Sequence, residues 1–139
     1  MIKVSNGTAF VTGIESLAKR VNLTRKLVVQ KMTADIWTKL TYRTPVDTGR
    51  ARASWNIAQG APNTSVPPEA KKGEKIPTPT MPSLDQIDGT QPVFVTSNVE
   101  YMTYLNEGTS KQAPAKFIEF AAAETLAEAQ LAAEAARGL

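Results

Sequence analysis

The stretch Thr44-Pro-Val-Asp-Thr-Gly-Arg-Ala-Arg-Ala-Ser-Trp55 decides the fold, because it ends a long helical segment and leads into the first strand. Pro45 keeps the residue before it out of the helical conformation and has no N–H with which to continue a helix. Gly49 can take the positive φ of a tight turn. The side chains of Asp47 and Thr48 can bond backbone N–H groups of that turn. The sequence therefore predicts a corner between a helix and a strand.

One long helix is expected before this corner. Thr12-Gly-Ile-Glu15 has the spacing of a capping box, and nothing breaks the helical pattern until about Tyr42. Six apolar residues share one face, as a helix packed on a core requires: Ile14, Leu17, Val21, Val28, Met32 and Ile36. Another apolar group falls on nearly the opposite face: Leu23, Leu27, Ala34 and Trp37. Either the C-terminal helix covers this second face, or it is a subunit interface that includes Leu23, Leu27 and Trp37.

The start of the chain has a hairpin signal. Residues 1–11 form two short alternating segments joined by Asn6-Gly7, the pair that type I′ turns favour. We expect an N-terminal hairpin. The alternative is an extended arm that lies on a neighbouring subunit.

A proline-rich arm follows the strand expected at residues 54–58. Seven of the nine prolines fall within residues 62–92, where bulky apolar residues are scarce. Such a segment cannot form sheet ladders or a core of its own, so we expect it to be extended or disordered in the free subunit. Pro77, Pro79 and Pro82 are candidate interface residues in this arm. A ligand for a proline-reading module is the alternative reading of its Pro-Thr-Pro-Thr run.

The last third returns to regular structure. We expect a strand at 91–97 with Val93 and Val95 on one side, and then a short helix or turn at 99–106. A second tight corner at 107–110 follows, with a strand passing through 109–112 as an option. Pro114 suits the first turn of a final helix anchored by Phe117, Ile118 and Phe120. The whole chain, 1–139, is thus predicted as a single α+β domain with a long N-terminal helix, a small antiparallel sheet interrupted by the long proline-rich arm, and a C-terminal helix.

The amino-acid composition excludes several kinds of catalytic and metal-binding chemistry. Histidine and cysteine are both absent, which removes the commonest general base, the commonest metal ligand and all thiolate chemistry. The acid pairs Asp85/Asp88 and Glu100/Glu107 are interpreted as surface charge, so we expect no enzyme, no catalytic residue, no cofactor and no metal. No apolar run approaches the length of a membrane span, and no export signal is recognisable, so we expect neither a membrane protein nor an exported one.

Charge is unevenly distributed along the chain. Residues 1–60 hold ten Lys or Arg against three acids, a net charge of +7, whereas residues 93–139 hold three against six, a net charge of −3. Opposite charges of this kind attract within a subunit or between neighbours. A nucleic-acid-binding surface is the alternative interpretation of the basic half.

Two motifs carry a resemblance to a known family. The pattern TPVDTGR-x-R-x-SW at 44–55, followed by SN-x-x-Y-x-x-YLNEGTS at 97–110 and by Ala-Pro at 113–114, resembles the tail-completion or neck proteins of long-tailed bacteriophages. That family includes the minor tail protein Z of phage lambda. The likeness covers roughly residues 14–122. The arm at 62–92 is long for this family, and the alanine-rich segment after Ala122 has no counterpart in the resemblance.

The resemblance implies a structural virion protein at the head–tail junction, assembled in the host cytoplasm. It would form a homo-oligomeric ring, expected to be a hexamer, that joins the tail tube or tail terminator to the connector or stopper and lets DNA pass without sequence-specific binding. Both corners would then be structural, and they include Pro45, Asp47, Gly49, Arg50, Glu107 and Gly108. The rival functions are a small basic nucleic-acid-binding module and a proline-arm adaptor.

Overall fold

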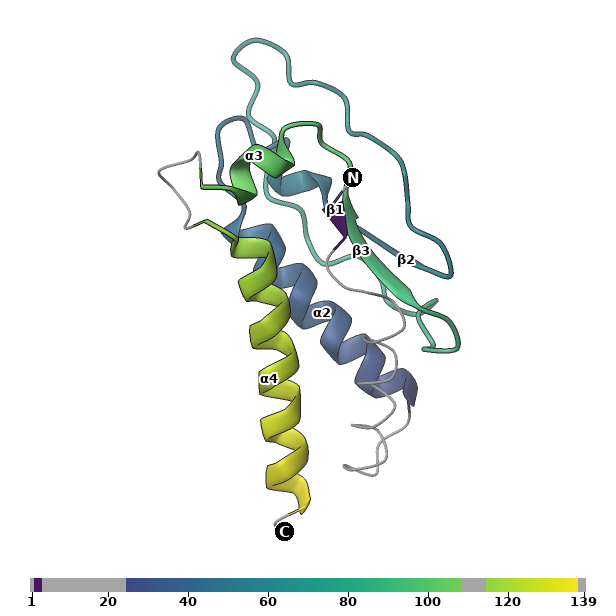
Figure 1. Cartoon of the computed structure of the whole chain (residues 1–139). Coiled ribbons are helices and arrows are strands. Elements are labelled where there is room, and N and C mark those ends of the chain that lie inside the picture. Colours follow the sequence, from purple (N-terminus) through teal and green to yellow (C-terminus); the bar gives the residue numbers. More distant parts are fainter. Residues whose placement is uncertain (1, 4–24, 109–114, 138–139) are drawn as a thin grey trace.

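The structure is a computed structural model that describes residues 2–3, 25–108 and 115–137 (Figure 1). It confirms the α+β class, with a small antiparallel sheet between helical segments. The elements in chain order are β1 (Ile2–Lys3), α2 (Arg25–Arg43), the 3₁₀ turn η1 (Arg52–Ser54), β2 (Asn56–Gln59), β3 (Val93–Ser97), α3 (Met102–Asn106) and α4 (Phe117–Arg137).

The sheet has the order β1-β3-β2, with β3 antiparallel to both neighbours. Asn56 pairs with Thr96 and Gln59 with Val93. The proline-rich arm therefore connects the edge strand β2 to the central strand β3. The central strand is the one with buried valines at alternate positions, as its sequence predicts. β1 pairs with β3, and the remainder of the hairpin expected at 1–11 lies outside the described residues.

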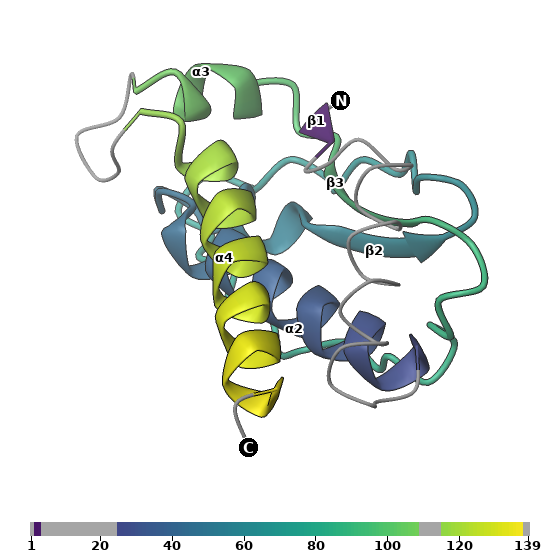
Figure 2. The same cartoon turned by 60° about the horizontal axis from the view of Figure 1, so that its bottom comes forward.

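The two long helices lie side by side, with α2 packed on the sheet (Figures 1 and 2). α2 ends at Arg43, two residues before Pro45, where the corner sequence predicts its end. The predicted beginning of this helix lies outside the described residues, and so do Ile14, Leu17, Val21 and Leu23. The rest of the predicted core face, Val28, Met32 and Ile36, is buried as expected.

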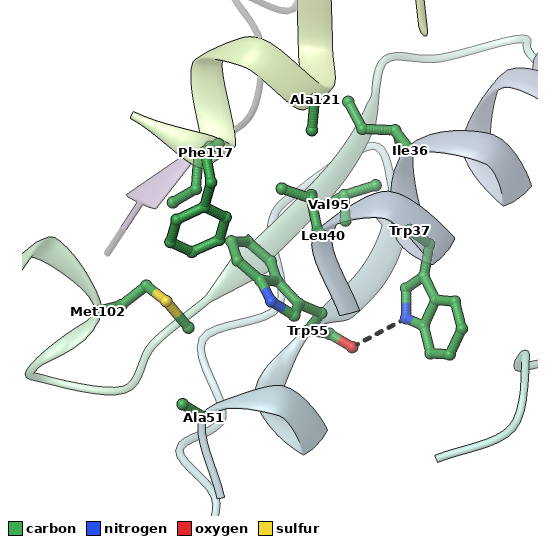
Figure 3. Close-up of a cluster of buried hydrophobic side chains, with 10 residues drawn as sticks. Ile36, Trp37, Leu40, Ala51, Trp55, Val95, Met102, Phe117 and Ala121 are labelled. Carbon is green, nitrogen blue, oxygen red and sulfur yellow. Dashed lines mark hydrogen bonds between the residues drawn. The ribbon is translucent and has the colours of Figure 1, made fainter. Parts of the chain in front are cut away.

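Two buried clusters make the core. The larger one joins α2, the corner, β3, α3 and the start of α4 around Leu40, Trp55 and Phe117 (Figure 3). The smaller cluster lies where the first turns of α2 meet Ile87 of the arm and Val93 of β3. An arm residue is therefore part of the core, although composition alone marks the arm as a segment without one.

Trp37 belongs to the larger cluster, so its prediction as an interface residue is wrong. Its side chain is 3% exposed in this single chain, and its indole N–H donates to the backbone oxygen of Trp55 at 3.3 Å (Figure 3). The face of α2 that carries Trp37 is covered by the corner and not by a partner. Leu27, from the same predicted face, is 54% exposed and remains an interface candidate.

The last helix divides into a packed half and an exposed half. Phe117 and Ile118 are buried, as predicted, but the prediction that Phe120 anchors the helix is wrong, because its side chain is 55% exposed. Leu126 packs against the smaller cluster, whereas Leu131 is 65% exposed. The first turn predicted around Pro114 and the strand at 109–112 lie outside the described residues.

The arm runs across its own subunit without helix or strand at residues 62–92, as the teal segment of Figure 1. It is fastened at both ends: the side chain of Asn98 donates to the backbone oxygens of Asn63 and Ser65, and the side chain of Gln30 donates to those of Leu84 and Ile87. The arm is thus extended along its own subunit. Because its backbone is bonded to its own subunit, the arm is held in place without a partner.

The return of the arm contains a charged loop whose carboxylate is held by hydrogen bonds. Asp88 accepts from the side chain and backbone N–H of Thr90 and from the side chain of Gln59, and these bonds lower the pKa of Asp88 from 3.8 to about 2. Gln59 in turn accepts from the backbone N–H of Asp88 and Gly89. The loop is therefore clamped to the end of β2.

This clamp should make stability depend on pH in acid. A carboxylate with a lowered pKa in the folded state stabilises that state above the unfolded pKa and loses the effect as pH falls from 3.8 towards 2. The free energy of unfolding of the wild type should therefore exceed that of Asp88→Asn at pH 6, and the difference should shrink below pH 4. Denaturant unfolding followed by tryptophan fluorescence measures it. Thr90→Val, which removes one hydrogen bond to Asp88, should reduce the pH-dependent part of the free energy of unfolding. If the free energy of unfolding changed with pH in the same way for wild type and Asp88→Asn, the interpretation would be contradicted.

Candidate functional site

The corner that begins at Pro45 is also the place where the arm docks. Gly49 has φ of 94°, in the left-handed region that favours glycine, and a Cβ there would collide with the backbone oxygen of Ile76. The N–H of Ile76 donates to the oxygen of Thr48 at 2.7 Å. The hydroxyl of Thr48 accepts the N–H of Arg50 at 3.2 Å, as the turn chemistry predicts. Glycine is needed both for the turn and for the approach of the arm.

Arg50 is the residue that joins the corner to the rest of the site. It is only 6% exposed, and its guanidinium donates to the backbone oxygens of Pro67 and Pro68 at 2.9–3.3 Å. It also pairs with Glu100 at 3.2 Å and lies over the ring of Tyr101, 5.7 Å from the ring centre. A guanidinium has five N–H donors in a fixed plane, which allows one side chain to hold three separate segments.

The proline carbonyls explain why an arginine is used here. Consecutive prolines at 67 and 68 have no N–H groups, so this part of the arm cannot form turn hydrogen bonds with its own donors. Charge-assisted donation by Arg50 satisfies those carbonyls. The ion pair with Glu100 contributes less, because the Glu100 side chain is 63% exposed and water screens the attraction.

Charges at the junction are stabilised by one another. Burial alone would lower the pKa of Arg50, but hydrogen bonds and attraction from Glu100 and Tyr101 outweigh burial, and the pKa is raised. The pKa of Glu100 is lowered, first by a hydrogen bond from its own backbone N–H and then by Arg50. Both groups are charged at neutral pH. Neither is poised for proton transfer, which suits a structural role.

A second contact joins the same two motifs. The hydroxyls of Ser54 and Ser97, both buried, lie 2.6 Å apart. One hydroxyl comes from the SW end of the first motif and the other from the SN start of the second. The two motifs that carry the family resemblance therefore contact each other at two points. They are distant in sequence, because Ser97 begins the second motif 42 positions after Trp55 ends the first.

An open recess of about 390 Å³ lies over this junction. Its wall contains the corner from Pro45 to Ala51, Glu69 and Ala70 of the arm, and Glu100, Tyr101 and Leu105. Asp47 and Glu69 are exposed on its rim, and the one cation at its floor, Arg50, is already paired. Within the described residues no group of three or more His, Cys, Asp or Glu is placed to hold a metal ion.

The second predicted corner supports the start of α4. Gly108 has φ of 89° and lies against Ala115, so the chain turns at Glu107-Gly108 as expected. The side chain of Asn106 accepts the N–H of Ile118 and donates to Glu119 at 3.0 Å. This amide fixes the last helix to α3. The sequence marks the turn, but it gives no signal for the part played by Asn106.

The candidate interface residues are scattered over the structure. Pro77 and Pro82 are exposed on the arm and Pro79 is half-buried. Leu27 is exposed on α2, Trp37 lies in the core, and Leu23 lies outside the described residues. The three prolines belong to the arm and Leu27 belongs to α2, so these candidates come from two separate segments of the chain.

Several basic residues in the described part of the basic half are engaged within the subunit. Lys39 pairs with Glu128 at 2.9 Å and also donates to Thr125, while Arg43 pairs with Glu124. Arg52 donates to the backbone oxygens of Tyr42 and Thr44 at the end of α2. Basic residues of α2 and acidic residues of α4 thus form ion pairs that help to hold the two helices together. In the described part of the chain, no helix is long and apolar enough to cross a membrane.

Comparisons with protein-family models, with curated proteins and with solved structures find no match to this chain.

Proposed function

We propose that this protein is a structural component of a long-tailed phage particle, a tail-completion or neck subunit that joins the tail to the connector as part of a homo-oligomeric ring. The observation that carries the proposal is the junction of the two family-like motifs through Arg50 and Glu100 and through the serine pair. In such a role the motifs hold one rigid shape. Nothing in their arrangement prepares a group for catalysis.

The rival nucleic-acid-binding function has less support. Lys39 and Arg43 point to glutamates of α4, and Arg50 and Arg52 are bonded to backbone oxygens of the same chain. A surface that binds a phosphate backbone needs cations that are available to replace counterions. DNA would instead pass through the lumen of the ring without specific contacts.

Removal of the protein tests the proposal. Particles assembled without it should accumulate as DNA-filled heads and complete tails that are not attached to each other, because a joining ring is needed only when two finished parts meet. Adding the purified wild-type chain to that lysate should restore infectious particles without new protein synthesis. Electron micrographs and infectivity measure the two effects. Joined virions in its absence, or empty heads caused by failed packaging, would overturn the proposal.

A further inference from the structure

β2 forms one edge of the sheet and has none of the features that protect such an edge. β3 lies between β1 and β2, so within the described residues each outer strand is paired on one side only (Figure 1). β1 is two residues long and carries Lys3, whereas β2 is four residues long with the sequence Asn-Ile-Ala-Gln. Natural proteins blunt an exposed edge with charged side chains, prolines or a very short strand. β2 has neither a charge nor a proline.

The pairing of β2 with β3 shows which backbone groups of β2 point outward. In an antiparallel pair, alternate residues direct their N–H and C=O groups to the neighbouring strand, and the residues between them direct theirs away. The N–H of Gly60 donates to the oxygen of Pro92 at 2.8 Å, so Ala58, two residues earlier, is also bonded to β3. Ile57 and Gln59 therefore direct their N–H and C=O groups away from β3. Within the described part of the chain, these four groups form no hydrogen bond.

We propose that β2 of a second copy of this chain pairs antiparallel with this edge, about a two-fold axis at Ala58. The inference goes beyond the proposed function and does not depend on it. In this register Ile57 of each copy lies opposite Gln59 of the other, so the two donors and two acceptors of each copy are all used in four hydrogen bonds. A register centred on Ile57 would instead place Gln59 opposite Trp55, whose oxygen already accepts the indole N–H of Trp37. The strand is thus its own complement in one register.

The side chains of β2 allow two copies of the strand to approach each other. Ile57 packs against both core clusters, so the side chains of Ile57 and Gln59 lie on one face of the sheet and that of Ala58 lies on the other. At the two-fold axis the two Ala58 residues form a pair without hydrogen bonds, with Cα atoms about 4.5 Å apart. A methyl group is small enough for this separation. Because β2 carries no charge, the strand does not repel its own copy.

The size of the contact predicts how the free chain behaves. Three residues of strand span roughly 10 Å, which is a small contact beside the ~800 Å² per partner of a stable specific interface. The free chain should therefore pair in concentrated solution and separate on dilution. A ring whose copies all face the same way has no two-fold contact between neighbours. The pair is thus a form of the free chain that has to separate before such a ring closes.

Disulfide formation tests the pairing, because the chain has no cysteine of its own. Cα atoms about 4.5 Å apart lie within the range of disulfides, so purified Ala58→Cys should form linked homodimers on mild oxidation. Asn56→Cys is the matched control: it lies on the same face of the same strand, but its two copies would be roughly 14 Å apart in this register. Its yield of linked dimer should be lower by at least about ten-fold. Equal yields from the two variants, or no linking of Ala58→Cys, would overturn the proposal.

Sedimentation of the wild-type chain gives a second measurement that needs no cysteine. The wild type should show a concentration-dependent equilibrium between monomer and dimer. Ala58→Lys brings two ammonium groups together at the axis, so it should raise the dissociation constant at least about ten-fold. Its melting temperature in dilute solution should match that of the wild type, because the Ala58 side chain is only half-buried. A wild type that stays monomeric at every concentration, or an Ala58→Lys variant that associates as the wild type does, would overturn the pairing. Both measurements use the purified chain alone, so neither depends on the outcome of the head–tail joining experiment.

Discussion

Replacing Trp37 by alanine should lower the free energy of unfolding by about 3–5 kcal/mol and the melting temperature by about 10–20 °C. The indole fills the larger core cluster between α2 and the corner, and it donates a hydrogen bond to the backbone of Trp55. Alanine would leave a cavity and an unpaired backbone oxygen. Denaturant unfolding followed by circular dichroism measures the change.

Leu27→Ala is the matched control for that experiment. It also truncates an apolar residue of α2 to alanine, but its side chain is exposed, so the free energy of unfolding should change by no more than about 0.5 kcal/mol. The contrast separates the two residues that sequence pattern places on the same face. A Trp37→Ala variant as stable as Leu27→Ala would mean that the indole is not part of the subunit core.

Replacing Arg50 by methionine should release the arm from the corner. The substitution keeps an unbranched apolar stem and removes the donors that satisfy the oxygens of Pro67 and Pro68 and that pair with Glu100. Hydrogen bonds from a charged donor are worth about 1.5–3 kcal/mol, which corresponds to a local opening about 10–150 times more frequent. Trypsin should therefore cut after Lys71 and Lys72 faster by about that factor, as measured by mass spectrometry of timed digests.

Arg52→Met provides the control for the arm experiment. Arg52 is two residues away and also donates to backbone oxygens, but these belong to Tyr42 and Thr44 at the end of α2 and not to the arm. Its substitution should leave the cutting rate at Lys71 and Lys72 close to that of the wild type. Equal rates in wild type and Arg50→Met would show that the arm does not depend on the Arg50 junction.

The elements were largely predictable because their causes are local. The end of α2 follows from the steric effect of Pro45, the turn from Gly49, and the buried side of β3 from alternation of valines. The interruption of the sheet by the arm between β2 and β3 follows from the proline-rich composition of residues 62–92. The same local reasoning placed Trp37 on an outer face, because helical angle gives the direction of a side chain but not what lies in that direction.

The site was predictable only in part. The sequence predicts a corner that includes Pro45, Asp47, Gly49 and Arg50, and the structure puts Arg50 at its centre. The first motif contains Asp47, Arg50 and Arg52 and the second contains Glu100 and Glu107, so the sequence alone does not indicate that Arg50 pairs with Glu100. The role of the Pro67 and Pro68 carbonyls had no signal, because any backbone oxygen can accept a hydrogen bond.

Within the described residues, sequence by itself determined where the chain bends and which segments are helix or strand, and the full sequence shows that neither histidine nor cysteine is available for chemistry. Those properties depend on φ/ψ preferences, hydrophobic period and composition, all of which act over a few residues or none. Only the tertiary structure decided that Trp37 is buried, that Phe120 is exposed, and that Arg50 joins segments 17 and 50 residues away. These outcomes depend on which distant surfaces meet, and that is settled by packing of the whole core rather than by any local pattern.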